Sequence, residues 1–328
     1  MANSSRLIDW ILKYSDLLQF KVIQLKWISD WMPGYFDYKV SIFARGKTHN
    51  GRGIDKNEAI AFSKASAEAL ERCATNGLDS PWNTSAYIDY VGARQRAYHE
   101  LVGIDRTLCH HFCKKPFKQI DLKVLEYHFN LRVLKKMLDK NDLEIGLYEL
   151  CPVSDAKICT MMAWHKNPNY KIRGFVNGFG CGADIKSAVV NATFECLRTM
   201  TAVFLGHAHS NIPLEKLEYP GSSSWHFWLT HNSLEAMNYF KRYLKPQKNL
   251  AVDFLPENLS IQDATFQRIT TLDRIFPDLP LSIVQARSDK FIHPQFGPTV
   301  LDAHTLKRLE QFNNAPVEVD HNIPHFYG

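Results

Sequence analysis

The chain has 328 residues, of which 45% are apolar and 22% charged, and this balance excludes a disordered, collagen-like or coiled-coil protein. The formal net charge of +5 suits a phosphate-bearing ligand or an acidic peptide, but it falls short of the clustered basic residues of a nucleic-acid-binding surface. No apolar run is long enough to span a membrane, and residues 1–18 lack the uninterrupted apolar core of a secretory signal. The seven scattered cysteines then favour reduced thiols and a cytoplasmic location.

Hydrophobic periodicity predicts that helices and strands alternate along the chain, which indicates an α/β fold. The predicted helices cover residues 5–18, 86–113, 122–138, 185–205, 234–244 and 264–275, and the predicted strands cover 23–27, 38–42, 143–150, 158–164, 172–179, 250–255 and 281–287. A further helix is expected to follow Gly51-Arg52-Gly53, with Asp55 as its N-cap and Glu58 completing a capping box.

No linker divides the chain, so a single domain over residues 1–328 is expected. Residues 1–40 supply its first helix and strand. Residues 206–233, rich in Gly, Pro, Ser and His, are predicted to form a long loop, and residues 321–328 a C-terminal tail.

The most informative feature is an internal repeat with the spacing A-x-x-x-A-x-x-E. Its three copies end in Glu68, Glu100 and Glu195, and the first and last copies are each preceded by a G-x-G segment, which is expected to form a glycine-rich turn. Positions i, i+4 and i+7 share one helical face, so the alanines allow close packing and the glutamate points into the same interface. A carboxylate there needs a partner.

Three such helices can bring three carboxylates to one cavity, and Glu71 adds a fourth beside Glu68. Clustered carboxylates repel one another unless a cation lies between them. Mg²⁺ takes oxygen ligands and commonly links protein carboxylates to nucleotide phosphates. The repeat therefore predicts a magnesium–nucleotide site.

At these residues the sequence resembles the YcaO superfamily, and most closely its azoline-forming branch. The first family signature, SxxxExxER, is matched by Glu68, Glu71 and Arg72, the middle one by Glu100 and Asp105, and the third by Gly178-Phe179-Gly180 and Glu195. The segment 282–297 resembles the family's last strand and Gly-ended turn, and the ending 322–328 resembles its Pro-rich tail. The resemblance runs from about residue 40 to the end of the chain.

This resemblance implies a YcaO-type domain whose strand–Gly turn–helix units surround a nucleotide, and an enzyme that uses ATP and Mg²⁺ to activate a backbone amide. In the azoline-forming branch a Cys, Ser or Thr of a ribosomal precursor peptide attacks the amide, so the enzyme needs no nucleophile of its own. The metal ligands implied are Glu68, Glu71, Glu100 and Glu195, and the nucleotide contacts add Lys64, Arg72 and Arg198.

Several positions depart from the family pattern. Lys64 replaces the Ser of the first signature, and Arg198 replaces the Gln of the third. Gly103 and Ile104 replace the second Glu and the Arg of the middle signature. The Lys and the Arg are able to contact phosphates in place of lost partners. Two alternatives stay open: a YcaO enzyme that makes a thioamide or an amidine, and a non-catalytic YcaO-like subunit of a peptide-modifying complex.

The resemblance also implies roles for the tail and for partner proteins. His325 or the Gly328 carboxylate is expected to position the amide or to move a proton. The match to the catalytic domain uses nearly the whole chain, so a separate E1-like or winged-helix protein is expected to bind the leader peptide. A flavin dehydrogenase is a further expected partner, and a homodimer is left open. No nucleic-acid or membrane partner is expected.

Cys109-His110-His111-Phe112-Cys113 offers metal-type ligands. No second ligand pair follows at the spacing of a zinc finger, so a buried helix end is the preferred interpretation. Gly46-Lys47-Thr48 resembles the end of a P-loop, but Ser41 occupies the position of the first glycine, and the motif is rejected.

Overall fold

The computed structural model describes residues 2–78, 80–204, 230–246, 254–294, 301–319 and 325. They belong to two compact units: unit 1 contains residues 1–100 and 264–288, and unit 2 contains residues 101–263 and 289–328. Helix α3 (Tyr90–Phe112) belongs partly to each. The predicted mixture of helices and strands is confirmed, and the paired strands of all three described sheets are antiparallel.

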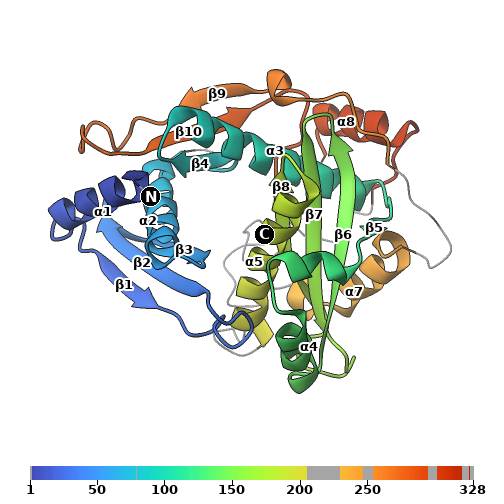
Figure 1. Cartoon of the computed structure of the whole chain (residues 1–328). Coiled ribbons are helices and arrows are strands. Elements are labelled where there is room, and N and C mark those ends of the chain that lie inside the picture. The colour runs from blue at the N-terminus through green and yellow to red at the C-terminus, as the bar shows by residue number, and fades with distance from the viewer. Residues whose placement is uncertain are drawn as a thin grey trace. The chain divides into compact units, whose positions relative to one another are not determined.

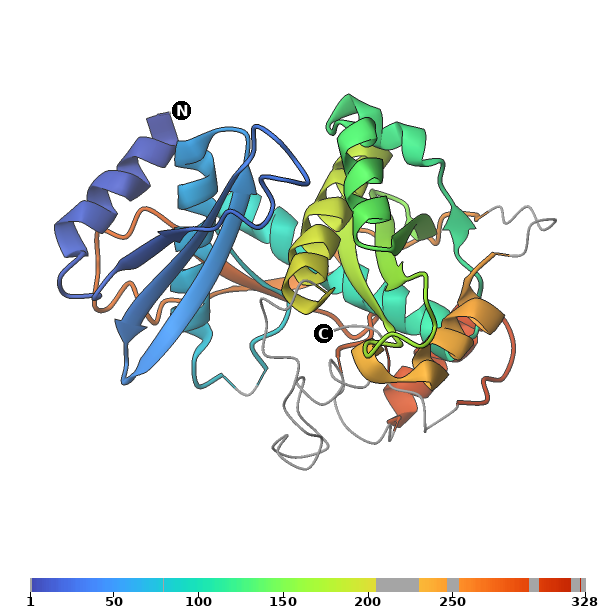
Figure 2. The same ribbon diagram turned by 90° about the horizontal axis from the view of Figure 1, so that it is seen from below.

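Unit 1 has two sheets with helices between them (Figures 1 and 2). The first sheet has the order β1-β2-β3 and the second the order β4-β10-β9. Their strands are β1 (Lys21–Gln24), β2 (Phe36–Ala44), β3 (Lys47–Asp55), β4 (Thr84–Tyr87), β9 (Thr265–Arg268) and β10 (Ser282–Arg287), and the helices are α1 (Ala2–Tyr14) and α2 (Glu58–Thr75). Both β3 and β4 are edge strands.

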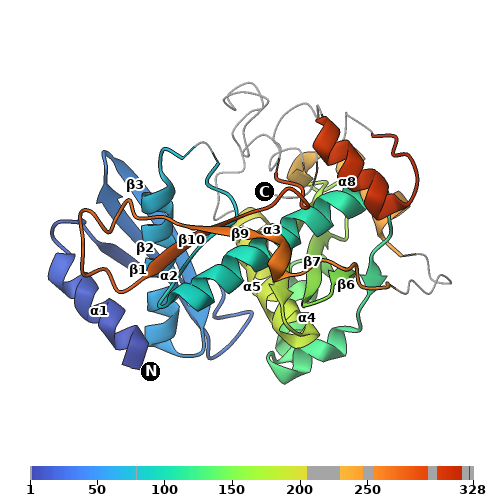
Figure 3. The ribbon, with the colours of Figure 1, turned by 90° about the horizontal axis from the view of Figure 1, so that it is seen from above.

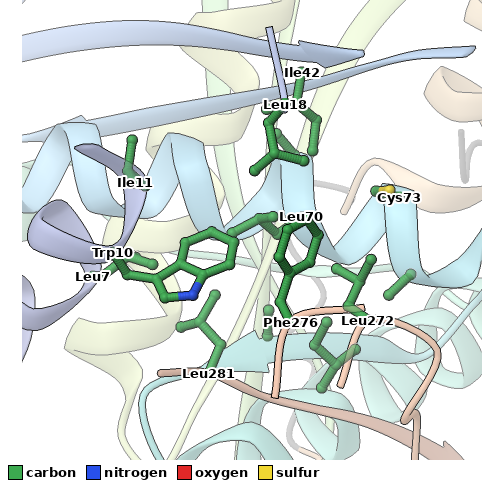
Figure 4. Close-up of a cluster of buried hydrophobic side chains, with 14 of the residues drawn as sticks. Leu7, Trp10, Ile11, Leu18, Ile42, Leu70, Cys73, Leu272, Phe276 and Leu281 are labelled. Atoms are coloured by element: carbon green, nitrogen blue, oxygen red, sulfur yellow. The ribbon is translucent and has the colours of Figure 1, made fainter. Parts of the chain in front are cut away.

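The core of unit 1 is one apolar cluster between these layers (Figure 4). Trp10 of α1, Ile42 of β2 and Leu70 of α2 meet Phe276 and Leu281 from the segment around β10, and each is at most 4% exposed. Trp10 and Phe276 contact edge to face, with their ring centroids 5.3 Å apart. This contact ties a late segment of the chain to its first helix.

Unit 2 is built on the sheet β5-β6-β7-β8. Helix α5 packs on β7 and β8, and Phe240 of the π-helical turn η3 contacts Tyr148, Trp164 and Phe175 on the other face (Figure 1). The elements are β5 (Lys118–Gln119), η1 (Leu122–Tyr127), α4 (Leu131–Lys140), β6 (Leu143–Val153), β7 (Ala156–His165), β8 (Phe175–Gly182), α5 (Ile185–Phe204), α7 (Leu234–Tyr239), η3 (Phe240–Leu244), η4 (Ile261–Asp263) and α8 (Ala303–Asn313). Strand β8 is an edge of the sheet.

Most long periodic segments fold as predicted, but several boundaries differ. The helix predicted over 264–275 is wrong, because β9 pairs there with β10. The helix predicted over 122–138 is two elements, because Asn130 caps α4 by accepting from the N–H groups of Arg132 and Val133. Asn57, rather than Asp55, caps α2. The strand predicted at 250–255 and the loop predicted at 206–233 lie largely outside the described residues.

The glycines of the repeat are not in turns, which corrects the predicted strand–Gly turn–helix unit. Gly51 and Gly53 lie within β3, and Gly178 and Gly180 lie within β8. A Cβ atom on Gly51 would be 2.0 Å from the Ala65 carbonyl oxygen of α2, and one on Gly180 would be 2.0 Å from that of Ala188 in α5. These glycines allow a strand and a helix to touch backbone to backbone.

Gly51→Ala should therefore destabilise the protein by about 3 kcal/mol or more, since neither backbone segment is able to yield. Gly103→Ala, in the interior of α3, is the matched control: a Cβ there meets nothing within 4 Å, so it should gain about 0.5–1 kcal/mol. Denaturant titrations of both variants measure the difference. Equal stability changes would contradict the close-packing explanation.

The densest polar cluster in the described part of unit 2 is a buried ion-pair network. The side chains of Asp105, Arg106 and Arg308 are at most 3% exposed, and Glu257 completes the network. Arg308 of α8 donates to Asp105 at 3.0 Å and to Glu257 at 2.8 Å, and the Ile292 N–H donates to Asp105 at 2.8 Å. The network therefore connects α3 to α8 and to the segments near Glu257 and Ile292. Helix α8 lies beside the end of α3 in Figure 3.

Asp105→Asn should cost about 3–5 kcal/mol, because it leaves two buried guanidinium groups short of negative charge. Asp139→Asn is the control. It removes one partner of an exposed ion pair with Lys166 and should cost less than about 1 kcal/mol. Chemical unfolding of both variants tests this expectation, and a cost at Asp105 no larger than at Asp139 would refute it.

Candidate functional site

The two G-x-G copies of the repeat fold into the same local structure. In both, an antiparallel hairpin ends in an edge strand and the following helix packs on that strand: β2, β3 and α2 in unit 1, and β7, β8 and α5 in unit 2. The alanines predicted to face the sheet do so, since Ala61, Ala65, Ala188 and Ala192 are all 0% exposed.

The repeat glutamates accept hydrogen bonds from the outer edges of these strands. Glu68 accepts from the backbone N–H of Arg52 at 2.8 Å, and Glu195 accepts from that of Phe179 at 2.8 Å. Arg52 and Phe179 are the middle residues of the two G-x-G segments. Each carboxylate thus satisfies an outward N–H that the sheet itself leaves without a strand partner.

The equivalence extends to the surrounding residues. The Lys64 ammonium donates to the Ile54 carbonyl at 3.3 Å, and the Asn191 amide donates to the Cys181 carbonyl at 3.2 Å. Asn57 accepts from a backbone N–H three residues on at the start of α2, and Asp184 does the same at the start of α5. The two copies therefore share a hydrogen-bonding pattern as well as a sequence pattern.

Glu71 and Glu100 bind a third strand edge in the same manner. Glu71 accepts from the Ala86 N–H of β4 at 2.8 Å, and Glu100 accepts from the Asn83 N–H just before β4 at 3.2 Å. All four predicted carboxylates are partly buried, and each holds a backbone N–H at or beside an edge strand. The sequence did not indicate these amide partners, although the middle residue of each G-x-G segment marks two of them.

Three of the four carboxylates influence one another within unit 1. Burial raises the pKa of Glu71 well above its ordinary value, the negative charge of Glu100 raises it further, and that of Glu68 adds to the effect. The Ala86 N–H and Arg72 oppose this shift only in part. A bound cation would lower the mutual repulsion, and carboxylate oxygens are the type of ligand that a hard divalent ion such as Mg²⁺ takes.

Two predicted phosphate contacts already bind carboxylates. Arg72 pairs with Glu68 at 2.6 Å and donates to the Asn50 carbonyl at 2.7 Å, and Lys64 pairs with Asp55 at 2.7 Å. Both side chains are more than a third exposed, so they are accessible to an anionic ligand. A cation held by Glu68 would compete with Arg72 for its carboxylate.

The structure therefore brings together Glu68, Glu71, Glu100 and Arg72 in unit 1, where the Lys64 ammonium binds Asp55 instead. Glu195 and Arg198 belong to unit 2. In the described ranges, no three carboxylate, imidazole or thiol groups are arranged to hold a metal ion. His325 is 1% exposed, and Gly328 lies outside the described residues.

The cysteine–histidine segment at the end of α3 is structural, as predicted. The Lys115 carbonyl accepts from His110 at 3.0 Å, and the other ring nitrogen accepts the Cys151 N–H at 2.9 Å. Burial lowers the pKa of His110 to about 3, which keeps it neutral. Burial also raises the pKa of both Cys109 and Cys113, so neither is an activated thiolate.

None of the helices that the structure describes is long and apolar enough to cross a membrane.

The raised pKa of Glu71 predicts a pH-dependent stability. A carboxyl whose pKa is raised by folding contributes stability below the pKa of the unfolded chain and loses that contribution as the pH rises through the folded-state pKa. Without divalent cations, the free energy of unfolding of the wild type should thus fall relative to that of Glu71→Gln as the pH rises above 4.5. Glu71→Asp keeps an ionisable group and should retain the pH dependence. Denaturant titrations across this range measure the effect, and a pH-independent difference from Glu71→Gln would argue against it.

Solved structures that are similar to this fold include a heterocyclase and a YcaO protein. A heterocyclase in complex with substrate and cofactor has a TM-score of 0.65 at 13% identity, over 96% of this chain and 56% of the heterocyclase chain. YcaO from Methanopyrus kandleri, bound with AMPPCP and Mg²⁺, has a TM-score of 0.57 at 13% identity, over 87% of this chain and 90% of that protein.

No protein-family model and no curated protein sequence matches the chain. The chain spans just over half the length of the heterocyclase. At this identity the likeness is one of fold. The chain has the YcaO fold, as its motifs predicted.

Proposed function

We propose that this protein is an ATP- and Mg²⁺-dependent enzyme that activates backbone amides of a peptide. In the form that its motifs favour, it is a cyclodehydratase that converts Cys, Ser or Thr residues of a ribosomal precursor peptide to azolines. The observation that supports this most directly is the duplicated carboxylate geometry, with Glu68 and Glu195 on equivalent strand edges of a YcaO fold.

In this proposal residues 1–328 act as one catalytic domain, and both repeats serve a single nucleotide. Glu68, Glu71, Glu100 and Glu195 hold Mg²⁺, while Lys64, Arg72 and Arg198 neutralise phosphate charge. The duplicated geometry supports this assignment, because each carboxylate is already fixed by a backbone N–H before any ligand binds. A pre-positioned carboxylate loses little conformational entropy when it binds a cation.

Bound ATP supplies the phosphoryl group that turns the amide oxygen into a leaving group. The side chain of the peptide attacks the amide carbon, the oxygen takes the γ-phosphoryl group, and phosphate departs as the C=N bond of the azoline forms. The net result is the loss of water from the peptide and the conversion of ATP to ADP and phosphate. The protein's task is to position the reactants and neutralise charge, as is usual for phosphoryl transfer.

Further roles belong to the same proposal. His325 and the Gly328 carboxylate position the amide or carry a proton. A separate E1-like or winged-helix protein binds the leader of the precursor, and a flavin dehydrogenase oxidises the azoline. The burial of His325 supports a fixed position for this part of the tail.

Glu68→Gln and Glu195→Gln should each weaken Mg-ATP binding at least tenfold, because each removes a charged ligand and keeps the shape of the side chain. Glu310→Gln, at an exposed position of α8, is the control with the same charge change and should bind Mg-ATP like the wild type. Isothermal titration calorimetry measures all three, with circular dichroism to verify folding. Unchanged affinity in both site variants would rule out the assignment.

The activity itself is tested by ATP hydrolysis with and without the precursor peptide and its leader-binding protein. Hydrolysis that depends on the peptide, with a mass loss of 18 Da from the product for each ring formed, is expected. A thioamide or an amidine would give a different mass change. Nucleotide binding without any turnover would instead favour the non-catalytic subunit.

A further inference from the structure

Unit 2 contains a pocket that the proposed chemistry does not use. Its volume is about 210 Å³, and it lies between the β7–β8 connection and one side of α7 and η3. Trp164, which lines it, packs on Phe240, so the pocket is on the face of the sheet opposite α5.

Basic residues outnumber acidic ones among the side chains that line this pocket. Lys166 and Arg173 from the β7–β8 connection and Lys241 and Lys245 from η3 and its end supply four basic groups, against one acidic group, Glu144. Glu144 accepts a hydrogen bond from the Trp164 indole N–H at 3.1 Å, which partly satisfies its carboxylate. Arg173 and Lys241 are exposed, so their charges are accessible to an anionic ligand and attract it. Lys166 is also exposed but already pairs with Asp139 at 2.8 Å, and Glu235 of α7 interacts with Arg173.

The floor of the pocket is apolar. Ile172 and Met237 are at most 4% exposed, while Leu234 at the entrance is 39% exposed. The volume is smaller than the roughly 300–1,000 Å³ of sites that enclose a drug-sized ligand. It suits a single apolar side chain better than a whole nucleotide. Trp164 is only 5% exposed and Lys245 lies 5.2 Å from its ring centroid, so the ring is not open for a base to stack on.

The two walls of the pocket are fixed to each other. The Gly174 N–H donates to the His231 carbonyl at 2.7 Å, and a Cβ on Gly174 would lie 1.8 Å from the Thr230 carbonyl oxygen. The segment carrying Arg173 is thereby held against the start of the α7 segment. The wall also contains a π-helical turn, closed by a bond from the Lys245 N–H to the Phe240 carbonyl at 2.8 Å, and such rare turns are frequent at functional sites.

From this combination we infer that the pocket docks an acidic peptide segment, inserting one apolar side chain between Ile172 and Met237 while neighbouring carboxylates contact Arg173 and Lys241. The pocket requires a ligand with both an apolar anchor and several separated negative charges, and an acidic peptide has both. Inorganic phosphate or a polyphosphate has the charge but no apolar group for the floor. A neutral apolar peptide has the anchor but gains nothing from the rim. This inference is independent of ATP chemistry.

The probe is a fluorescein-labelled synthetic peptide in which Glu residues flank a central Leu, and binding is followed by fluorescence anisotropy at low salt. The double variant Arg173→Gln/Lys241→Gln should bind it at least tenfold more weakly than the wild type. Lys135→Gln/Lys136→Gln, at exposed positions of α4, makes the same change in net charge and should bind within twofold of the wild type. Leu234→Ser should weaken binding severalfold. Circular dichroism verifies that each variant folds.

A peptide with Gln in place of every Glu should bind at least tenfold more weakly than the acidic probe, and tripolyphosphate should compete poorly. The inference is overturned if the pocket variant binds like the wild type, or if the α4 variant is weakened equally. Tight binding of tripolyphosphate that depends on Arg173 and Lys241, without peptide binding, would also overturn it. Because no assay here contains ATP, failure would leave the proposed enzymatic function standing.

Discussion

The architecture depends on how closely one helix approaches one strand edge in each repeat. Glycine in β3 and β8 and alanine in α2 and α5 let the backbones touch, and any larger side chain on those glycines would collide with a helix carbonyl. This contact decides where the next glutamate goes. From its position on the same helical face, its carboxylate reaches the outward N–H of the strand at 2.8 Å in both units. The close packing of helix on strand therefore also fixes the position of the charged carboxylate.

That placement has a structural and a chemical consequence. Structurally, a carboxylate on an outward N–H satisfies an edge strand that would otherwise be open to pairing with another chain. Chemically, it holds negative charge at a fixed, partly buried position, and burial together with the charges of Glu100 and Glu68 raises the pKa of Glu71. A bound divalent cation would lower the repulsion among these carboxylates, and this is one physical reason for the proposal that such an ion binds there.

The features that the sequence predicts correctly are those that depend on a local pattern of residues. The spacing of alanines and glutamates identified the repeat, and the buried strands β6 and β7 followed from their apolar runs. The G-x-G segments were misassigned to turns because glycine serves both turns and close approaches, and only the neighbouring helix decides between them. The sequence does not predict the ion-pair network of Asp105, Glu257 and Arg308, because its members lie far apart in the chain. The helix predicted over 264–275 failed because pairing with β10 overrode local periodicity.

We propose that Glu68 and Glu195 both bind Mg-ATP, and a crystal structure of the protein with Mg²⁺ and a non-hydrolysable ATP analogue tests this proposal most directly. The proposal predicts one nucleotide per chain, with Mg²⁺ held by oxygens of the repeat carboxylates. It also predicts that Glu68 and Glu195 both belong to that site. A nucleotide bound away from these residues, or one contacting only one of the two repeats, would contradict it.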